Sequence, residues 1–267
     1  MRNFLKELNI VGIVHLWEEG EAIKHVIDNL LKWCNYICLV MDFPDIITDV
    51  IIREYKKKYP EIIQFEYFKY DIVRTAKNCR RREKLIREQV VEQKLAMVKR
   101  IHEEIKPVDI LLTPDSDEIY TNYLPEMLEK FWKSDFTSIC TKPIDVYGNF
   151  YLIHNKSMMS HWRAYKYQPE ISFTPRRFQD HYYPYPAKEA WRGLNGGFIH
   201  LTSHKDFLNL KKRINHGDLL KVHPNAKFWK LDKPAYELTP EEYVDIIKNK
   251  KPDFIAEKDY DKIKNYA

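Results

Sequence analysis

The chain has little glycine: 7 of its 267 residues are Gly. Gly12 and Gly20, the two in the N-terminal third, stand alone, so no Gly-rich loop that could wrap a phosphate follows the first apolar segment. Gly193, Gly196 and Gly197 lie together, so close backbone approach is expected there instead.

Long hydrophobic runs are also absent, and no stretch approaches the eighteen apolar residues of a membrane span. Residues 1–7 alternate charged and apolar side chains and do not form the apolar centre of a signal peptide. The four cysteines show no disulfide framework. Cys34 and Cys38 lie in an apolar setting without a nearby His, which favours small buried thiols over metal ligands. These features predict a cytoplasmic protein.

The composition is that of a folded protein, with 44% hydrophobic residues. The formal net charge of +5 suits anionic ligands such as nucleotide phosphates, but it is too small to indicate nucleic-acid binding by itself.

Short apolar runs alternate with amphipathic segments along the first half of the chain. This order predicts an α/β fold with a mostly parallel central sheet flanked by helices and right-handed crossovers. The expected strands are 9–15, 36–41, 62–68 and 108–112, and the expected helices are 23–31, 48–59 and a long one within 75–106.

An acidic segment directly follows the fourth predicted strand. Asp115, Asp117 and Glu118 come after the apolar run 108–112. Ligands of open α/β sheets bind at the carboxyl ends of the strands, and a divalent cation would neutralise like charges gathered there. An ordinary turn with a helix N-cap is the alternative. An EF-hand is excluded, because Tyr120 stands where that loop needs Gly.

The long predicted helix opens with a basic cluster, residues 80–82, and Arg87 follows. Such charges usually form a solvated face. An arginine at this place could also pair with a diphosphate, because guanidinium and phosphate match in a fork.

The second half begins with a predicted helix at 124–132 and a strand at 136–141, and then becomes rich in aromatics, His and Pro between 147 and 204. Aromatic walls suit sugar rings, although aromatics are equally good core residues. His200 and His204 follow the paired glycines and are either core histidines or metal ligands. A basic amphipathic helix is expected over 205–221, followed by a peripheral polar tail.

These landmarks together resemble GT-A nucleotide-sugar glycosyltransferases, close to glycosyltransferase family 2. The segment 111–118 (Leu-Leu-Thr-Pro-Asp-Ser-Asp-Glu) resembles the family's Asp-x-Asp metal motif, and 196–200 (Gly-Gly-Phe-Ile-His) lies where related enzymes place a further metal-binding His. The resemblance covers residues 9–135 well and the later segment more loosely. It implies a GT-A (Rossmann-like) fold with a sugar-nucleotide-binding part at 1–135, an aromatic-rich acceptor part at 136–223 and a helical C-terminal extension at 224–267.

The resemblance also implies a hexosyltransferase-like reaction with Mn²⁺ or Mg²⁺ and a nucleotide-sugar donor, expected to be a UDP-sugar. The acceptor could be a glycan, a lipid-linked group, a protein or a nucleic acid. The implied metal ligands are Asp115, Asp117 and His200. The implied donor-binding residues are His15, Trp17, Glu18, Asp42, Arg82, Asp115 and Ser116. The candidates for a catalytic base are Asp180 and Glu189, with Glu170 as a further possibility.

The sequence departs from the family at two places. Residues 41–45 (Met-Asp-Phe-Pro-Asp) lack the family's Gly and Ser, and Trp17-Glu18 replaces its Asn-Glu. Other interpretations therefore stay open: an inactive relative, a non-catalytic carbohydrate- or nucleic-acid-binding protein, or a nucleotidyltransferase, which would usually carry the Gly-rich loop missing here.

Overall fold

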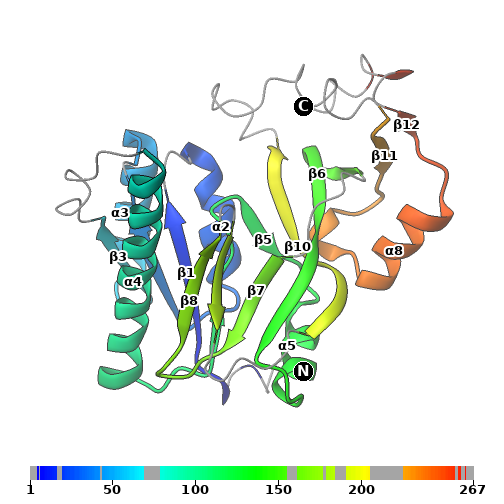
Figure 1. The fold of residues 1–267 in the computed structure, drawn as a ribbon. Coiled ribbons are helices and arrows are strands. Elements are labelled where there is room, and N and C mark those ends of the chain that lie inside the picture. Colours follow the sequence, from blue (N-terminus) through cyan, green and yellow to red (C-terminus); the bar gives the residue numbers. More distant parts are fainter. Residues whose placement is uncertain are drawn as a thin grey trace.

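The computed structural model describes the chain over residues 5, 7–16, 20–42, 44–68, 79–154, 161–176, 179–183, 191–204, 225–255, 258, 259 and 262. A large central sheet runs through the molecule, with helices on both of its faces (Figure 1). The sheet contains ten strands. Its main path runs β12 (Phe254–Ile255), β11 (Lys227–Lys230), β6 (Ser138–His154), β7 (His161–Lys166), β4 (Ile110–Leu112), β1 (Ile10–Leu16), β2 (Tyr36–Met41) and β3 (Ile63–Tyr67).

One half of this sheet is parallel, as the alternation of apolar runs and amphipathic segments predicts. Its strands are β1 (Ile10–Leu16), β2 (Tyr36–Met41), β3 (Ile63–Tyr67) and β4 (Ile110–Leu112). β1 pairs in parallel with both β2 and β4, and β2 pairs in parallel with β3. The expected α/β fold, with parallel strands flanked by helices, is therefore confirmed.

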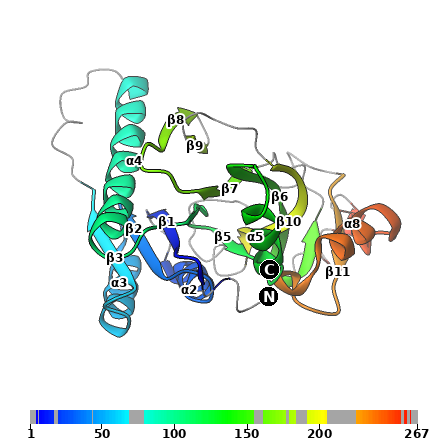
Figure 2. The ribbon, with the colours of Figure 1, turned by 90° about the horizontal axis from the view of Figure 1, so that it is seen from below.

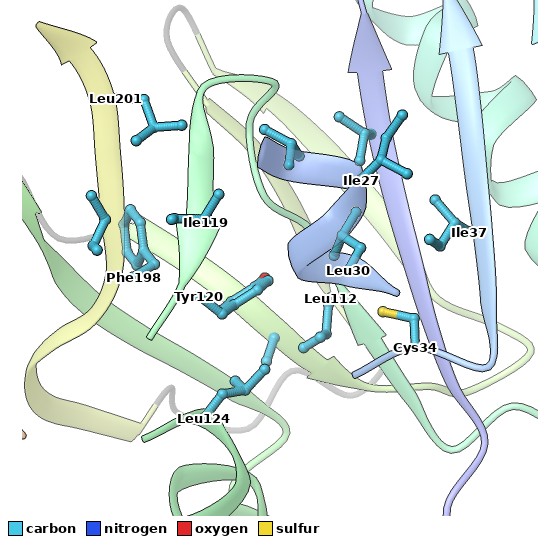
Figure 3. Close-up of a cluster of buried hydrophobic side chains, with 14 of the residues drawn as sticks. Ile27, Leu30, Cys34, Ile37, Leu112, Ile119, Tyr120, Leu124, Phe198 and Leu201 are labelled. Atoms are coloured by element: carbon cyan, nitrogen blue, oxygen red, sulfur yellow. The ribbon is translucent and has the colours of Figure 1, made fainter. Parts of the chain in front are cut away.

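β1, β2 and β4 are buried on both faces, whereas β3, at the edge of the sheet, is only partly buried. In β1, Val11 and Ile13 belong to one apolar cluster, whereas Ile10 and Val14 belong to the other. Successive side chains of a strand point to opposite faces, so one strand contributes side chains to both clusters. Figure 2 shows α4 (Cys79–Glu104) on one side of these strands and α2 (Ile23–Leu30) and α3 (Ile46–Lys58) on the other. Figure 3 shows part of the larger cluster, where Leu30 and Cys34 pack beside Ile37 of β2.

The helices bury the faces that their apolar periodicity predicts. They are α2 (Ile23–Leu30), α3 (Ile46–Lys58), α4 (Cys79–Glu104) and α5 (Leu124–Trp132), with a short 3-10 turn, η1 (Gly20–Ala22), before α2. The side chain of Asp45 caps α3 by accepting a hydrogen bond from the N–H of Thr48. Ile105, which the spacing assigns to the apolar face of α4, is 55% exposed, because the helix ends at Glu104 before another turn can pack.

The other half of the sheet is mixed. It contains β5 (Glu118–Tyr120), β6 (Ser138–His154), β7 (His161–Lys166), β10 (Trp191–His204), β11 (Lys227–Lys230) and β12 (Phe254–Ile255). β6 begins near the predicted strand 136–141 but continues to residue 154. It can do so because β7 and β10 pair with its first residues, β10 continues to Gly148, and β11 pairs with its end.

The remaining described elements are peripheral. β8 (Ser172–Arg176) and β9 (Gln179–Tyr183) form a separate hairpin. A 3-10 turn, η3 (Ala235–Glu237), precedes α8 (Pro240–Asn249), whose N-terminus carries a capping box formed by Thr239 and Glu242. The basic helix expected at 205–221 lies outside the described residues. None of the described helices has both the length and the apolar character needed to cross a membrane.

Burial in the interior decides between the alternatives that the sequence leaves open for the cysteines and for two of the aromatic residues. Cys34, Cys38 and Cys140 are buried free thiols, and burial raises the pKa of Cys38 to about 12. Cys34 and Cys38 are therefore packing residues, as expected, and Cys140 is one as well. From the aromatic region, Tyr147 and Tyr165 are fully buried. For these two side chains the core interpretation holds, and a sugar-stacking wall would have to come from other aromatics.

Candidate functional site

The candidate site lies at the carboxyl ends of β1, β2 and β4. The register pairs Gly12 with Leu112, so the segment that follows β4 runs beside the C-terminal residues of β1. His15 and Asp42 stand at the ends of β1 and β2, and the acidic segment follows β4. Three predicted groups of site residues thus meet at one edge of the sheet because the strands are parallel.

A buried arginine stands in the centre of the acidic segment. The Nη2 atom of Arg163, on β7, lies 2.5 Å from Asp115 Oδ2 and 2.7 Å from Glu118 Oε1. Its Nε atom lies 2.5 Å from Glu118 Oε2, and the side chain is 4% exposed. The guanidinium also stands over the ring of Phe198, 5.3 Å from its centroid. Charge-assisted hydrogen bonds from Nη2 to both carboxylates, with Nε close to Glu118, hold the start of β5 against β7.

The charges in this cluster depend on one another. Burial raises the pKa of Glu118, and Asp115 adds to the rise, whereas Arg163 opposes it. Burial alone would lower the pKa of Arg163, but Asp115 and Glu118 outweigh it and raise that pKa. The guanidinium therefore carries a permanent positive charge next to two carboxyl groups.

Asp115, Glu118 and His161 form a set with the composition of a metal site, since one ligand atom from each lies within 4.8 Å of the others. Arg163 contacts all three, including His161 Nδ1 at 3.0 Å. A cation bound there would have to displace a buried guanidinium and lose its ion pairs. In the described conformation this set therefore fits Arg163 and does not fit a metal.

A second cluster joins Asp117 and His200. His200 Nε2 lies 3.3 Å from Asp117 Oδ2, and His200 Nδ1 lies 3.2 Å from Asp145 Oδ1. Asp117 is in the turn between β4 and β5, Asp145 is on β6, and His200 is on β10. The carbonyl of Asp117 accepts a hydrogen bond of 2.7 Å from the N–H of Leu201, which ties the acidic turn to β10.

The donor set at Asp117 and His200 fits a divalent cation. Oxygen and imidazole donors suit Mn²⁺, and Mg²⁺ accepts carboxylates. Two neighbouring ligands of an octahedral ion with bonds of about 2.1 Å lie about 3 Å apart, close to the observed separation of 3.3 Å. The predicted pair Asp117 and His200 thus meets in space, while Asp115 is paired with Arg163; the role of all three as metal ligands stays a prediction.

The pKa of His200 gives a pH-dependent prediction. Burial alone would lower this pKa, but Asp117 and Asp145 outweigh it and raise it well above the ordinary 6.5. The imidazolium therefore stabilises the metal-free fold below about pH 6.5, the unfolded-state pKa. This stabilisation is lost as the pH rises through the folded-state pKa. We expect urea unfolding in EDTA to show wild-type stability falling with pH above neutrality relative to His200→Gln; parallel pH profiles would contradict this.

His15 and Asp42 form the part of the site nearest β2. His15 Nε2 lies 3.6 Å from Asp42 Oδ2. Within the described part of the chain, His15 Nε2 and Asp42 Oδ1 are buried atoms without a hydrogen-bond partner. Unsatisfied buried polar atoms are costly, so these two atoms are available to a ligand, and the predicted donor-binding role of His15 and Asp42 stays a prediction.

A small pocket of about 170 Å³ opens beside these residues on the α4 side of the sheet. It is lined by Ile13, His15, Lys94, Thr113, Pro114, Asp115, Ser116 and Arg163. Lys94 comes from α4 and is 5% exposed. Two buried cations, Lys94 from α4 and Arg163 from β7, thus line one polar cavity, which suits a phosphate group.

The other predicted residues have mixed outcomes. Trp17, Glu18 and Glu189 lie outside the described residues. Arg82, Asp180 and His204 fall on α4, β9 and β10, but their side chains are not among those described. Glu170 follows Tyr167, whose N–H bonds to the carbonyl of Asp109 before β4. It therefore lies at the opposite edge of the sheet from Asp117 and is wrong as a candidate base.

Three residues of the site are not predicted from the sequence: Lys94, Asp145 and Arg163. Lys94 belongs to a helix in which charges are frequent, and Arg163 alternates with apolar residues as a solvent-facing strand residue would. Asp145 alone leaves a local signal, because a carboxylate between Ile144 and Val146 in a strand is costly unless it has a partner.

No family model matches the chain, and no curated protein matches its sequence. The solved structures similar to it include 4-diphosphocytidyl-2C-methyl-D-erythritol synthase from Anaerococcus prevotii, with 13% identity over 61% of this chain and 72% of that chain and a TM-score of 0.36.

Two further solved structures show a similar degree of likeness. Glucosyl-3-phosphoglycerate synthase from Mycobacterium tuberculosis, in complex with Mn²⁺, UDP and phosphoglyceric acid, has 15% identity over 53% of this chain and 45% of that chain, with a TM-score of 0.33. A protein described as a glucose-1-phosphate thymidylyltransferase from Bacillus anthracis has 10% identity over 78% and 77%, with a TM-score of 0.34. Because these TM-scores lie below 0.5, the function proposed below depends on the site itself.

Proposed function

We propose that the protein is a metal-dependent glycosyltransferase that moves a hexosyl group from a nucleotide-sugar donor, a UDP-sugar, to an acceptor hydroxyl. The observation that carries this proposal is the contact between Asp117 and His200 beside a polar pocket lined by Lys94 and Arg163. A metal-ligand pair and buried cations at the carboxyl edge of a parallel half-sheet suit a nucleoside diphosphate.

Each part of the donor has a matching group in the site. The carboxylate of Asp42, with one unsatisfied buried oxygen, can accept a hydrogen bond from an N–H of the base, and His15 stands beside it. Lys94 and Arg163 can contact the phosphates. Asp117 and His200 would hold Mn²⁺ or Mg²⁺, with Asp115 a further predicted ligand.

The reaction needs a leaving group that accepts charge and an acceptor that loses a proton. The acceptor oxygen attacks the anomeric carbon, and the bond from that carbon to the phosphate oxygen breaks with its electron pair going to the nucleoside diphosphate. When bound, the metal acts as a Lewis acid that neutralises this charge. Lys94 and Arg163 stabilise the same charge as it develops. Asp180 and Glu189 remain the proposed candidates for the base that takes the acceptor proton in an inverting reaction.

Lys94 offers a specific test of the phosphate pocket. We expect Lys94→Met to weaken UDP binding about 10–100-fold, because a hydrogen bond to a charged group contributes roughly 1.5–3 kcal/mol. Lys99→Met is the matched control from the same helix, since the Lys99 side chain is 61% exposed. Calorimetric titration of UDP measures both variants. Equal affinities for the two would remove Lys94 from the binding site.

The proposal as a whole is tested by calorimetric titration of UDP and a panel of UDP- and GDP-sugars, with and without Mn²⁺. Binding that requires Mn²⁺ supports a sugar-nucleotide site, and slow hydrolysis of the best ligand identifies the donor. No binding in either condition would contradict the proposal and favour a non-catalytic carbohydrate- or nucleic-acid-binding protein.

A nucleotidyltransferase remains the rival enzyme class, since it also uses carboxylates and a divalent cation at a sheet edge. It would join a nucleoside triphosphate to a sugar phosphate and release pyrophosphate, whereas a glycosyltransferase releases a nucleoside diphosphate. Phosphorus NMR of the products separates the two reactions.

A further inference from the structure

Asp145 is the buried residue of the candidate site for which the proposed reaction has no use. Its side chain is 4% exposed, and its Oδ1 atom lies 3.2 Å from His200 Nδ1. Asp117, by contrast, is 20% exposed and contacts the other ring nitrogen, Nε2, at 3.3 Å. The imidazole is therefore held between an interior carboxylate and one on the turn.

The strand register creates this contact. His200 pairs with Asp145 of β6 on one side and with Glu118 of β5 on the other. Register irregularities in β10 occur on both sides of the Ile199–His200 segment. Such irregularities re-aim side chains, and they leave His200 in a regular stretch next to Asp145. Register partners share one face of a sheet, so the two side chains meet there.

The protonation of His200 follows from its partners. A carboxylate can only accept, so the contact with Asp145 requires the proton to be on Nδ1. In the neutral imidazole, the lone pair is then on Nε2, the nitrogen that faces Asp117. A carboxylate behind a metal-binding His commonly fixes its tautomer and orientation in this way.

We propose that Asp145 is the positioning residue of the metal site, holding His200 as the Nδ1–H tautomer so that Nε2 and Asp117 are presented together to the cation. This inference depends on the proposed metal-dependent function. It adds a residue that contacts neither metal nor substrate and acts only through His200.

Mn²⁺ binding without nucleotide gives the first test, measured from the EPR signal of free Mn²⁺. We expect Asp145→Ala to weaken Mn²⁺ binding about 10–100-fold, as loss of such an outer carboxylate typically does. Asp145→Asn should recover most of the affinity, because its amide oxygen accepts the same Nδ1–H bond. Thermal unfolding confirms that both variants are folded. Mn²⁺ affinities within about twofold of wild type in Asp145→Ala would overturn the proposal.

The tautomer of His200 gives a second test, because a residue that only stabilises the fold would not change which ring nitrogen carries the proton. In ¹⁵N-histidine NMR of the metal-free protein, at a pH where His200 is neutral, the His200 signals are identified by their loss in His200→Gln. We expect the Nδ1–H form in wild type and a shift toward the Nε2–H form in Asp145→Ala. Wild-type His200 in the Nε2–H form would overturn the proposal even if Asp145→Ala does not fold.

The same EPR experiment separates failure of this inference from failure of the proposed function. If wild type and His200→Gln bind Mn²⁺ equally, His200 is not a ligand, and the metal site and the role of Asp145 are both overturned. If His200→Gln weakens binding but Asp145→Ala does not, only the role of Asp145 is overturned.

Discussion

Replacing Asp117 by Asn should abolish Mn²⁺-dependent UDP binding and reduce turnover by about 10²–10³-fold, the usual cost of removing one charge-stabilising group from a reaction centre. Asn keeps the shape of the side chain but loses its charge, so His200 would keep Asp145 beside Nδ1 but lose the carboxylate beside Nε2. The measurements are calorimetric titration of UDP with Mn²⁺ and release of nucleoside diphosphate from the best donor.

The fold should tolerate this substitution. The Asp117 side chain is 20% exposed, and its structural hydrogen bond to Leu201 is made by the main-chain carbonyl. Asp245→Asn, at an exposed position of α8, is the matched control and should behave as wild type. Near-normal turnover of Asp117→Asn would contradict the assignment of Asp117 as a metal ligand. Asp115→Asn extends the test: a comparable loss of Mn²⁺ affinity would support Asp115 as a ligand in spite of its pairing with Arg163.

Arg163→Met should cause the largest loss of stability, about 3–5 kcal/mol, because it leaves the buried Glu118 without its counter-charge. Methionine has a similar length, so the loss reports the charge and its hydrogen bonds more than a cavity. Urea unfolding measures the free energy. Arg53→Met is the matched control: Arg53 pairs with Asp49 at 2.9 Å, but its side chain is 56% exposed, and a surface pair contributes at most about 1 kcal/mol.

A double-mutant cycle separates the ion pair from general packing. Arg163→Met combined with Glu118→Gln removes both charges, so the double variant should be more stable than Arg163→Met alone. Additive losses would show that the two side chains do not interact in solution, and the arrangement around β5 would then differ from the one described.

The sequence predicted the half of the fold in which local pattern decides structure. The strand 36–41 and the helix 124–132 agree with β2 and α5 residue for residue, because apolar periodicity differs between a strand buried on both faces and an amphipathic helix. The position of Asp115 and Asp117 after β4 followed from the same pattern, since polar residues that end a buried strand must lie at the sheet edge.

The contacts within the candidate site were decided by the tertiary structure. That His200 meets Asp117 was expected only from the family resemblance, and that Asp145 lies on its other nitrogen was not expected at all. Arg163 forms ion pairs with Asp115 and Glu118 because β7 runs antiparallel to β4. Periodicity shows which face of its own strand a residue occupies. Which side chain stands opposite depends on strand order, direction and register, and these are set by packing between segments far apart in the chain.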